Sequence, residues 1–248
     1  MKAGLVSISF RKLTVEEVCA AAAKANLSCI EWGSDVHAPR NDADRLAQIV
    51  KVQNAYGITC CSYGTYFYLG VDPIEELPEY IQAAKALNTN ILRLWCGKKS
   101  PDTITEEEKA ALFHSCKQAA QIAEDAGVTL CLEAHRNTYT ETKEGALELM
   151  EYVNSPAFQM YYQPNQFRTV EENIQYARLL APYTYHLHVF QWKEKDRFPL
   201  SQGIAEWQSY LKEFSGEHAL LLEFMPDDDV NSLPAEASAL HQIIGGTK

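Results

Sequence analysis

Four side chains that could bind a metal ion or move a proton stand at or near the ends of short apolar runs. Glu133 follows Leu130-Cys131-Leu132, and Gln163, His188 and Glu223 lie at or near the ends of three later runs. A run of this length after a helix-ending glycine is typical of a buried strand. A charged side chain at the end of such a buried strand is unfavourable unless a counter-charge, a hydrogen bond or a metal ion compensates it. These positions are therefore the first candidates for a chemical site.

The residue types favour a divalent cation. Side chains alternate along a strand, so Cys131 and Glu133 share the face opposite to Leu130 and Leu132. Two carboxylates at one depth would repel each other, and one would be protonated, unless a cation joined them. Two carboxylates, an imidazole and an amide oxygen form a coordination sphere for Mn²⁺, Mg²⁺ or Co²⁺, with Zn²⁺ as an alternative. No set of cysteines suited to structural zinc is present.

The elements that must position these side chains alternate along the chain. Short apolar runs occur at 4–9, 29–32, 58–62, 91–96, 129–133, 158–163, 185–190 and 219–224. Amphipathic segments follow them at 15–25, 42–55, 73–87, 105–125, 142–153, 169–180, 204–214 and 232–244. Three of these segments start with a capping box, formed by Thr14 with Glu17, Thr105 with Glu108 and Thr169 with Glu172.

Eight strand–helix units predict a parallel sheet closed into a (β/α)8 TIM barrel. No linker rich in Pro, Gly or Ser divides the chain, so residues 1–248 are predicted to form one domain. An open doubly wound sheet is the alternative, but Ser9–Lys12 is not the glycine-rich turn typical of that fold. Active sites of such barrels lie at the C-terminal ends of the strands, where the four candidates would meet.

Composition restricts the partners and the compartment. The 22 basic and 33 acidic residues give a formal net charge of -11, which argues against extended contact with nucleic acid. No apolar run is long enough to span a membrane, and Lys2–Phe10 does not resemble a signal peptide. The seven cysteines are odd in number and mostly lie in apolar segments, so we expect reduced thiols and a cytoplasmic protein.

Several motifs together resemble one family, the xylose-isomerase-like TIM barrels of the sugar phosphate isomerase/epimerase group. The resemblance covers nearly the whole chain. Its motifs are Ile30-Glu31-Trp32-Gly33-Ser34-Asp35-Val36-His37, Ser62-Tyr63-Gly64, Leu132-Glu133-Ala134-His135, His186-Leu187-His188-Val189 and Leu222-Glu223-Phe224. Each motif alone is weakly specific, and together they are moderately specific for the superfamily.

The resemblance implies a metal site and an acid/base pair. A Glu, an Asp, a His and a second Glu hold one divalent metal in that family, and these positions correspond to Glu133, Gln163, His188 and Glu223. The two glutamates would also act on either side of the substrate carbon. Gln163 departs from the family pattern, since many members have Asp there, and the lost charge should weaken metal binding. Gln191 is a second departure, at a position where many relatives have an acid.

Loop and aromatic residues near the strand ends are candidates for contact with a sugar. The predicted substrate-binding residues are His37, Tyr63, Trp95, His135, Arg136, Gln166 and Trp192, and Trp32 and Tyr66 could add to an apolar wall. Packing within the barrel explains any single aromatic residue equally well. A structural acid paired with Arg136 or Lys143 is the alternative for Glu133, and His186 is expected to have a core or supporting role.

The basic residues Lys193, Lys195 and Arg197 follow the seventh run, where barrels often bind phosphate. A solvated loop is the favoured interpretation, because Glu194 and Asp196 are interspersed among them.

The leading functional hypothesis is a metal-dependent isomerase or epimerase acting on a sugar or sugar derivative. Glu133 and Glu223 would remove and return the proton next to a carbonyl. A metal-dependent dehydratase acting on a polyol-derived ketone is the second hypothesis, since the same base and cation can eliminate water. A non-catalytic carbohydrate-binding descendant is the third, motivated by Gln163. The partner is a small carbohydrate, and relatives of this group often form homo-oligomers.

Overall fold

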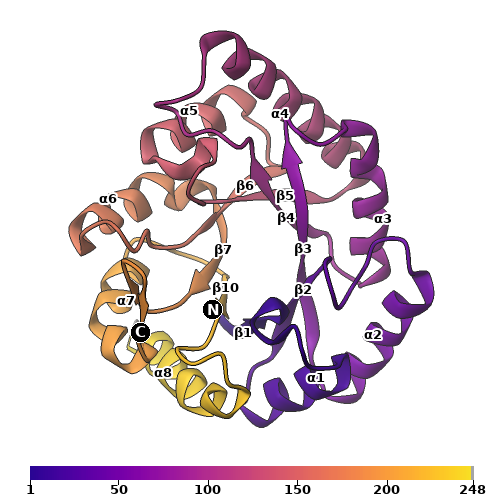
Figure 1. Ribbon diagram of the computed structural model, residues 1–248, viewed down its shortest axis with the longest axis vertical. Helices are drawn as coiled ribbons and strands as arrows, with labels where there is room; N and C mark the ends of the chain where they lie inside the picture. The colour runs from indigo at the N-terminus through magenta and orange to yellow at the C-terminus, as the bar shows by residue number, and fades with distance from the viewer. Residues whose placement is uncertain (247–248) are drawn as a thin grey trace.

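The computed structural model describes residues 1–246, within which eight parallel strands close into a barrel around a central axis (Figure 1). The strands pair in chain order, and the last one returns to the first. They are β1 (Lys2–Val6), β2 (Cys29–Gly33), β3 (Thr59–Leu69), β4 (Ile91–Cys96), β5 (Thr129–Glu133), β6 (Phe158–Tyr162), β7 (Thr184–Val189) and β10 (Ala219–Leu222). The predicted (β/α)8 TIM barrel is confirmed, and an open sheet is excluded.

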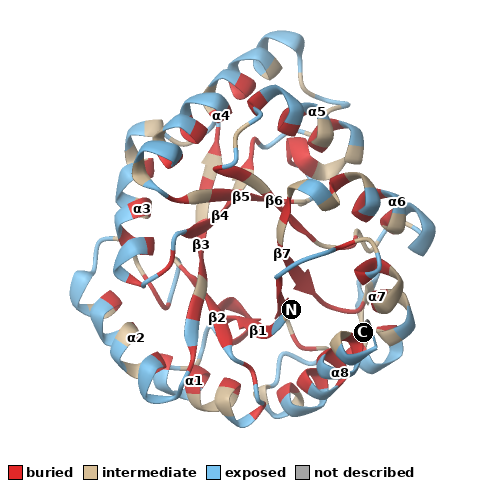
Figure 2. Cartoon of the chain, turned by 180° about the vertical axis from the view of Figure 1, so that it is seen from behind, coloured by how far each residue is buried: buried red, intermediate tan, exposed pale blue. Residues whose placement is uncertain are grey.

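The helices form a ring outside the strands (Figure 1). They are α1 (Val15–Lys24), α2 (Ala43–Ala55), α3 (Leu77–Ala86), α4 (Glu106–Ala126), α5 (Lys143–Val153), α6 (Val170–Leu180), α7 (Ile204–Leu211) and α8 (Leu233–Gly245). Their inner faces are buried against the barrel and their outer faces are exposed, as Figure 2 shows. The three predicted capping boxes are present at α1, α4 and α6. None of the helices within residues 1–246 is long and apolar enough to cross a membrane.

Some element boundaries differ from the prediction. The first strand ends at Val6 rather than residue 9, because Ser7–Phe10 turn into a 3-10 helix. β3 runs on to Leu69, beyond the predicted end at residue 62. A short antiparallel hairpin of β8 (Trp192–Lys193) and β9 (Asp196–Arg197) follows β7 and was not predicted.

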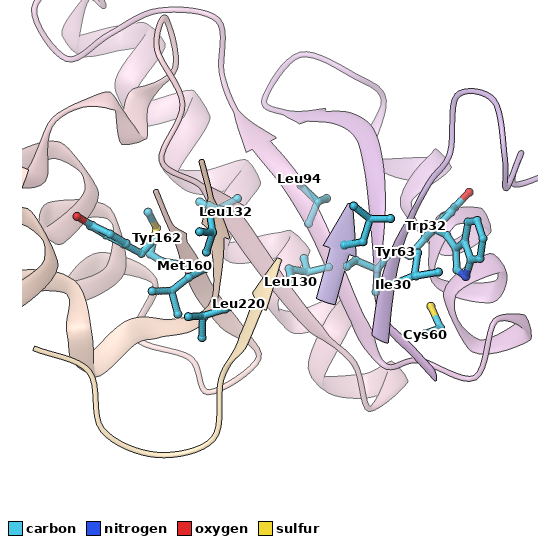
Figure 3. Close-up of a cluster of buried hydrophobic side chains, with 14 of the residues drawn as sticks. Ile30, Trp32, Cys60, Tyr63, Leu94, Leu130, Leu132, Met160, Tyr162 and Leu220 are labelled. Carbon is cyan, nitrogen blue, oxygen red and sulfur yellow. The ribbon is translucent and has the colours of Figure 1, made fainter. Parts of the chain in front are cut away.

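The barrel has two apolar layers, which follow from the alternation of side chains along each strand. The outer layer lies between strands and helices, and Figure 3 shows Leu130, Leu132 and Met160 within it. A smaller cluster fills the barrel interior and contains Val6, Cys29, Ile91, Cys131, Tyr161, Ala219 and Leu221. The predicted alternation in β5 is confirmed, because Cys131 points inward while Leu130 and Leu132 point outward. All seven cysteines are free thiols, as predicted.

Candidate active site and metal centre

The four predicted ligands converge at the C-terminal end of the barrel. Glu133 ends β5, Gln163 follows β6, His188 lies in β7, and Glu223 follows β10. His188 Nδ1 is 3.2 Å from Gln163 Oε1, 3.6 Å from Glu223 Oε2 and 3.9 Å from Glu133 Oε1. Ligand atoms of the two glutamates and the histidine lie within 4.8 Å of one another, and all three residues are buried. Four donors from consecutive barrel strands thus surround one point.

One oxygen of the Glu133 carboxylate is held by neighbouring side chains, and the other faces the candidate metal site. Its Oε2 accepts a 2.6 Å hydrogen bond from the Trp95 indole and lies 3.3 Å from Arg93 Nη1. Its Oε1 faces His188. The alternative, a structural acid paired with Arg136 or Lys143, is wrong in its partners, because Glu133 pairs with Arg93. Arg136 stacks over the Phe167 ring, and Lys143 pairs with Glu144.

Gln163 is oriented as an oxygen donor. Its amide nitrogen donates to the Ala134 carbonyl at 3.2 Å, so the amide oxygen turns toward His188 Nδ1. An oxygen at this position matches the ligand role that the family resemblance implied. It adds no charge, so the anionic part of the set consists of the two glutamates alone.

The environment moves the pKa values of the two glutamates apart. Burial and the neighbouring carboxylates of Glu133 and Glu31 raise the pKa of Glu223. Burial opposes ionisation of Glu133 too, but Arg93, His188 and His135 lower its pKa. Burial is also outweighed at His188, where the surrounding carboxylates of Glu223, Glu31 and Glu133 raise the pKa to about 9. In the absence of a cation, the raised pKa values of His188 and Glu223 favour proton binding at both groups, which reduces the negative charge.

This donor set fits a divalent cation. A carboxylate of Glu31 lies beneath the site but is paired with Arg93, so these two charges cancel. The remaining anions are Glu133 and Glu223, whose two negative charges together balance the charge of one divalent cation. Oxygen donors with a single imidazole suit Mn²⁺, Mg²⁺ or Zn²⁺, and no thiol belongs to the Glu133–His188–Glu223 group found within residues 1–246.

Glu31 and Arg93 were missed by the sequence-based prediction. Both project from mid-strand into the barrel, where Arg93 is 1% and Glu31 0% exposed. Arg93 Nε lies 3.3 Å from Glu31 Oε1, and Glu31 Oε2 accepts a 2.5 Å hydrogen bond from the Ser62 hydroxyl. Burial disfavours the charge, yet His188, Arg93 and Ser62 lower the pKa of Glu31 to about 2. A charged residue inside an otherwise apolar run was the available signal at both positions.

A glycine on β3 leaves room for this buried pair. A Cβ atom at Gly64 would lie 2.7 Å from Glu31 Oε1 and 3.1 Å from Arg93 Nη2. We therefore expect Gly64→Ala to displace the pair and to lower the free energy of unfolding by about 1–3 kcal/mol, measured by urea denaturation. Gly245→Ala is the control, since nothing lies within 4 Å of its added methyl group. Equal stability of the two variants would contradict this account of Gly64.

The backbone directly after Glu223 is strained. Phe224 has φ of 56°, a left-handed conformation that is rare for a bulky residue. Its amide donates to the Ser9 hydroxyl at 2.8 Å, and its ring lies 5.8 Å from the Trp192 ring. Strained residues of this kind occur most often at functional sites. Ser9 and Phe224 together fix the direction in which Glu223 leaves β10.

A cavity of about 260 Å³ opens at the C-terminal end of the barrel and is lined by three of the four candidate ligands, Glu133, Gln163 and Glu223. It is lined by Glu133, Ala134, His135, Arg136, Asn137, Gln163, Pro164, Asn165, Gln166, Phe190, Trp192, Glu223 and Phe224. The predicted substrate-binding residues His135, Arg136, Gln166 and Trp192 are among them. Trp95 is absent from this lining, and it contacts the site through its hydrogen bond to Glu133. The cavity combines an aromatic wall with polar groups that could meet hydroxyls.

Two predicted substrate-binding residues lie elsewhere. Tyr63 is fully buried on the outer side of β3, where its hydroxyl donates to the Ala38 carbonyl at 2.7 Å (Figure 3). Ser62 and Gly64 take the inward positions, so alternation turns Tyr63 away from the cavity. His37 is also fully buried, with Nε2 3.0 Å from the Leu13 carbonyl oxygen. Both residues pack the structure around the site, and neither lines the cavity.

His186 lies at the opposite end of the barrel interior. Its Nδ1 accepts a 3.1 Å hydrogen bond from the Ala219 amide, and the Tyr161 ring is 5.5 Å from His186 and 5.1 Å from His188. Burial lowers the pKa of His186 to about 4. A neutral core histidine is consistent with the expected structural role.

The basic residues after β7 are largely ion-paired. Lys193 lies 3.6 Å from Glu206, and Arg197 pairs with Asp228. This arrangement agrees with the solvated-loop interpretation rather than with an open phosphate site.

Comparison with known proteins adds the family context. The family model described as "Xylose isomerase-like TIM barrel" matches residues 19–241. The probable 3-DHS dehydratase AsbF from Bacillus anthracis shares the fold with a TM-score of 0.81 and 18% identity, covering 97% of this chain and 99% of that chain.

Two further structures are similar. D-Psicose 3-epimerase from Clostridium cellulolyticum H10, solved with D-tagatose, has a TM-score of 0.74 and 15% identity, covering 100% of both chains. The IOLI protein, solved with a zinc atom, has a TM-score of 0.80 and 17% identity, covering 100% of this chain and 98% of that chain. At these identities the likeness concerns the fold. No curated protein matches the sequence.

Proposed function

Because the chain belongs to the xylose isomerase-like TIM barrel family, we propose that it is a metal-dependent isomerase or epimerase acting on a sugar or sugar derivative. The observation that carries this proposal is the convergence of Glu133, Gln163, His188 and Glu223 beneath a cavity of about 260 Å³. We further propose Mn²⁺ as the preferred ion, with Mg²⁺, Co²⁺ or Zn²⁺ as substitutes.

Each side chain has a distinct task in this reaction. Glu133, Gln163, His188 and Glu223 would hold the cation, which would supply Lewis-acid polarisation of a carbonyl next to the carbon that loses its proton. Glu133 and Glu223 approach from strands β5 and β10, and their separated pKa values suit one acid and one base. His135, Arg136 and Gln166 meet the polar groups of the substrate. Trp192 packs against its apolar face and keeps water away from the reacting carbon.

A dehydratase is the second candidate. The base that removes a proton next to a carbonyl can also drive loss of a β-hydroxyl, with no change in the ligand set. A probable 3-DHS dehydratase is among the structures of the same fold, and so is an epimerase. The same residues could support either reaction, so identification of the reaction product distinguishes an epimerase from a dehydratase.

The test is proton exchange in D₂O with Mn²⁺ present. The protein is incubated with ketoses such as D-psicose and D-tagatose, with aldoses, and with inositol-derived ketones, and deuterium uptake is followed by mass spectrometry. Deuterium in a rearranged sugar supports the isomerase or epimerase. A new enone absorbance supports the dehydratase. Saturable sugar binding with no exchange by any compound would overturn both and favour a non-catalytic carbohydrate-binding protein.

Metal dependence has its own expected result. Mn²⁺ at about 100-fold above its Kd should stabilise the fold by about 2.7 kcal/mol, which raises Tm by about 5–10 °C for a chain of this size. The rise is measured by thermal denaturation and should be reversed by EDTA. Gln163→Asp adds a third carboxylate at the site and should shift the response to lower Mn²⁺ concentration.

Gln175→Asp is the matched control, because it adds the same charge on the exposed face of α6. An unchanged Tm at millimolar Mn²⁺, Mg²⁺, Co²⁺ and Zn²⁺ would exclude the metal site. An equal response of the two variants would exclude Gln163 as a ligand.

A further inference from the structure

The second nitrogen of His188 lacks a hydrogen-bond partner at normal length. Nδ1 faces Gln163 and the two ligand glutamates, and Nε2 points to the other side of the ring. His188 is 0% exposed, so bulk solvent does not contact this nitrogen. The nearest carboxylate oxygen is Glu31 Oε1, at 3.5 Å. A buried polar group without a partner is unfavourable, so this contact needs an explanation.

Coordination by Nδ1 requires a specific protonation of the ring. The nitrogen that binds the cation must present its lone pair, so the hydrogen must reside on Nε2. Metal-binding histidines commonly donate that hydrogen to a carboxylate, which fixes the ring orientation and raises the basicity of the ligand nitrogen. Glu31 is the carboxylate in place to accept it, and the Ser62 hydroxyl holds its other oxygen at 2.5 Å.

The Glu31 carboxylate beneath the site would add a third negative charge to those of Glu133 and Glu223. Arg93 prevents this, since its Nε lies 3.3 Å from Glu31 Oε1. The same guanidinium reaches Glu133 Oε2 at 3.3 Å and donates to the Thr65 carbonyl at 3.1 Å. One arginine thus neutralises the residue behind His188 and steadies the neighbouring ligand. The charge of the ligand set itself remains matched to a divalent ion.

We infer that Glu31 is a positioning residue that holds His188 with Nε2–H directed away from the cation and Nδ1 directed toward it, and that Arg93 is its counter-charge. This inference rests on the proposed metal-dependent function. It assigns a role to two buried residues on β2 and β4, outside the set of four ligands. It also explains why an ion pair is maintained inside the barrel, where apolar residues would otherwise fill the space.

The test measures metal affinity and the His188 ring in Glu31→Gln. Calorimetric titration with Mn²⁺ or Zn²⁺ should give a Kd about 10–100-fold above that of the unmodified protein. In the Zn²⁺-loaded protein, the low-field His188 Nε2–H proton resonance should move upfield or disappear. The ring signals of His186 are an internal reference, since that ring lies at the opposite end of the barrel interior, where its Nδ1 accepts a hydrogen bond from the Ala219 amide. Glu31→Gln/Arg93→Met should regain part of the affinity, because it removes the positive charge that Glu31 no longer balances beside the ligand set.

Glu213→Gln is the matched control, because Glu213 forms an exposed pair with Arg178 at the surface. Its Kd should equal that of the unmodified protein. A Glu31→Gln protein with unchanged Kd and an unchanged His188 resonance would overturn the inference, even if its Tm fell. Absence of metal binding by the unmodified protein would instead overturn the proposed function on which the inference rests.

Discussion

Glu223→Gln is expected to lower kcat by about 10²–10⁴-fold, the usual contribution of a positioned acid or base. Glutamine has the same size and can still offer an oxygen toward His188, so the fold and part of the metal affinity should remain. What disappears is a group that can accept and return a proton. Turnover and deuterium exchange are measured with whichever compound of the panel reacts.

The geometry makes Glu223 the more informative of the two glutamates. Within residues 1–246 no hydrogen-bond donor contacts its carboxylate other than the His188 ring, whereas Glu133 is held by Trp95 and Arg93. Loss of Glu223 therefore removes a proton-transfer group without breaking a buried network. Glu133→Gln should also abolish turnover, but it perturbs Arg93 as well, so its effect has two causes.

Glu217→Gln provides the control for Glu223→Gln. It carries the same substitution just before β10, at the opposite end of that strand, and its residue is exposed. Its kcat should match that of the unmodified protein. If Glu223→Gln and Glu133→Gln both keep kcat within about tenfold, acid/base chemistry by these two residues is excluded, since that loss is below the range expected for such groups.

The sequence predicted the barrel and the convergence of the four candidate ligands because both depend on local patterns. The run at 129–133 has a helix-ending glycine before it and an acid at its end, and the structure has β5 at the same residues. The common location of active sites at C-terminal strand ends then brings Glu133 and Glu223 together without any knowledge of distances. These two steps require only periodicity and topology.

Residues whose roles depend on strand register were not predicted. Glu31 meets Arg93 only because β2 and β4 each pair with β3, in a register that shifts between Ile30 and Glu31. Alternation within β3 turns Tyr63 outward, because Ser62 pairs with Glu31 on the inward face, although the position of Tyr63 near a predicted strand end suggested the cavity. His37 lies in a loop that folds back against Leu13, and no local pattern indicates that contact. Tertiary packing determines all of these positions.

Arg93→Met is expected to have the largest effect on stability, lowering the free energy of unfolding by about 3–5 kcal/mol. Methionine fills much of the arginine volume, so the main loss is electrostatic. Glu31 and Glu133 would face each other inside the barrel without their shared cation, and the Thr65 carbonyl would lose its donor. Urea denaturation of the metal-free protein measures this cost directly.

The double variant Glu31→Gln/Arg93→Met should be more stable than Arg93→Met alone. Removing Arg93 alone leaves two buried carboxylates, Glu31 and Glu133, without their cation, whereas the double variant leaves only Glu133 in that state. Arg178→Met is the control, because its partner Glu213 lies at the surface and such pairs contribute about 0–1 kcal/mol. Additive losses in the double variant would show that Arg93 acts through packing instead. Arg93 would then stabilise the barrel through its volume, and Glu31 would need a different source of stabilisation beneath His188.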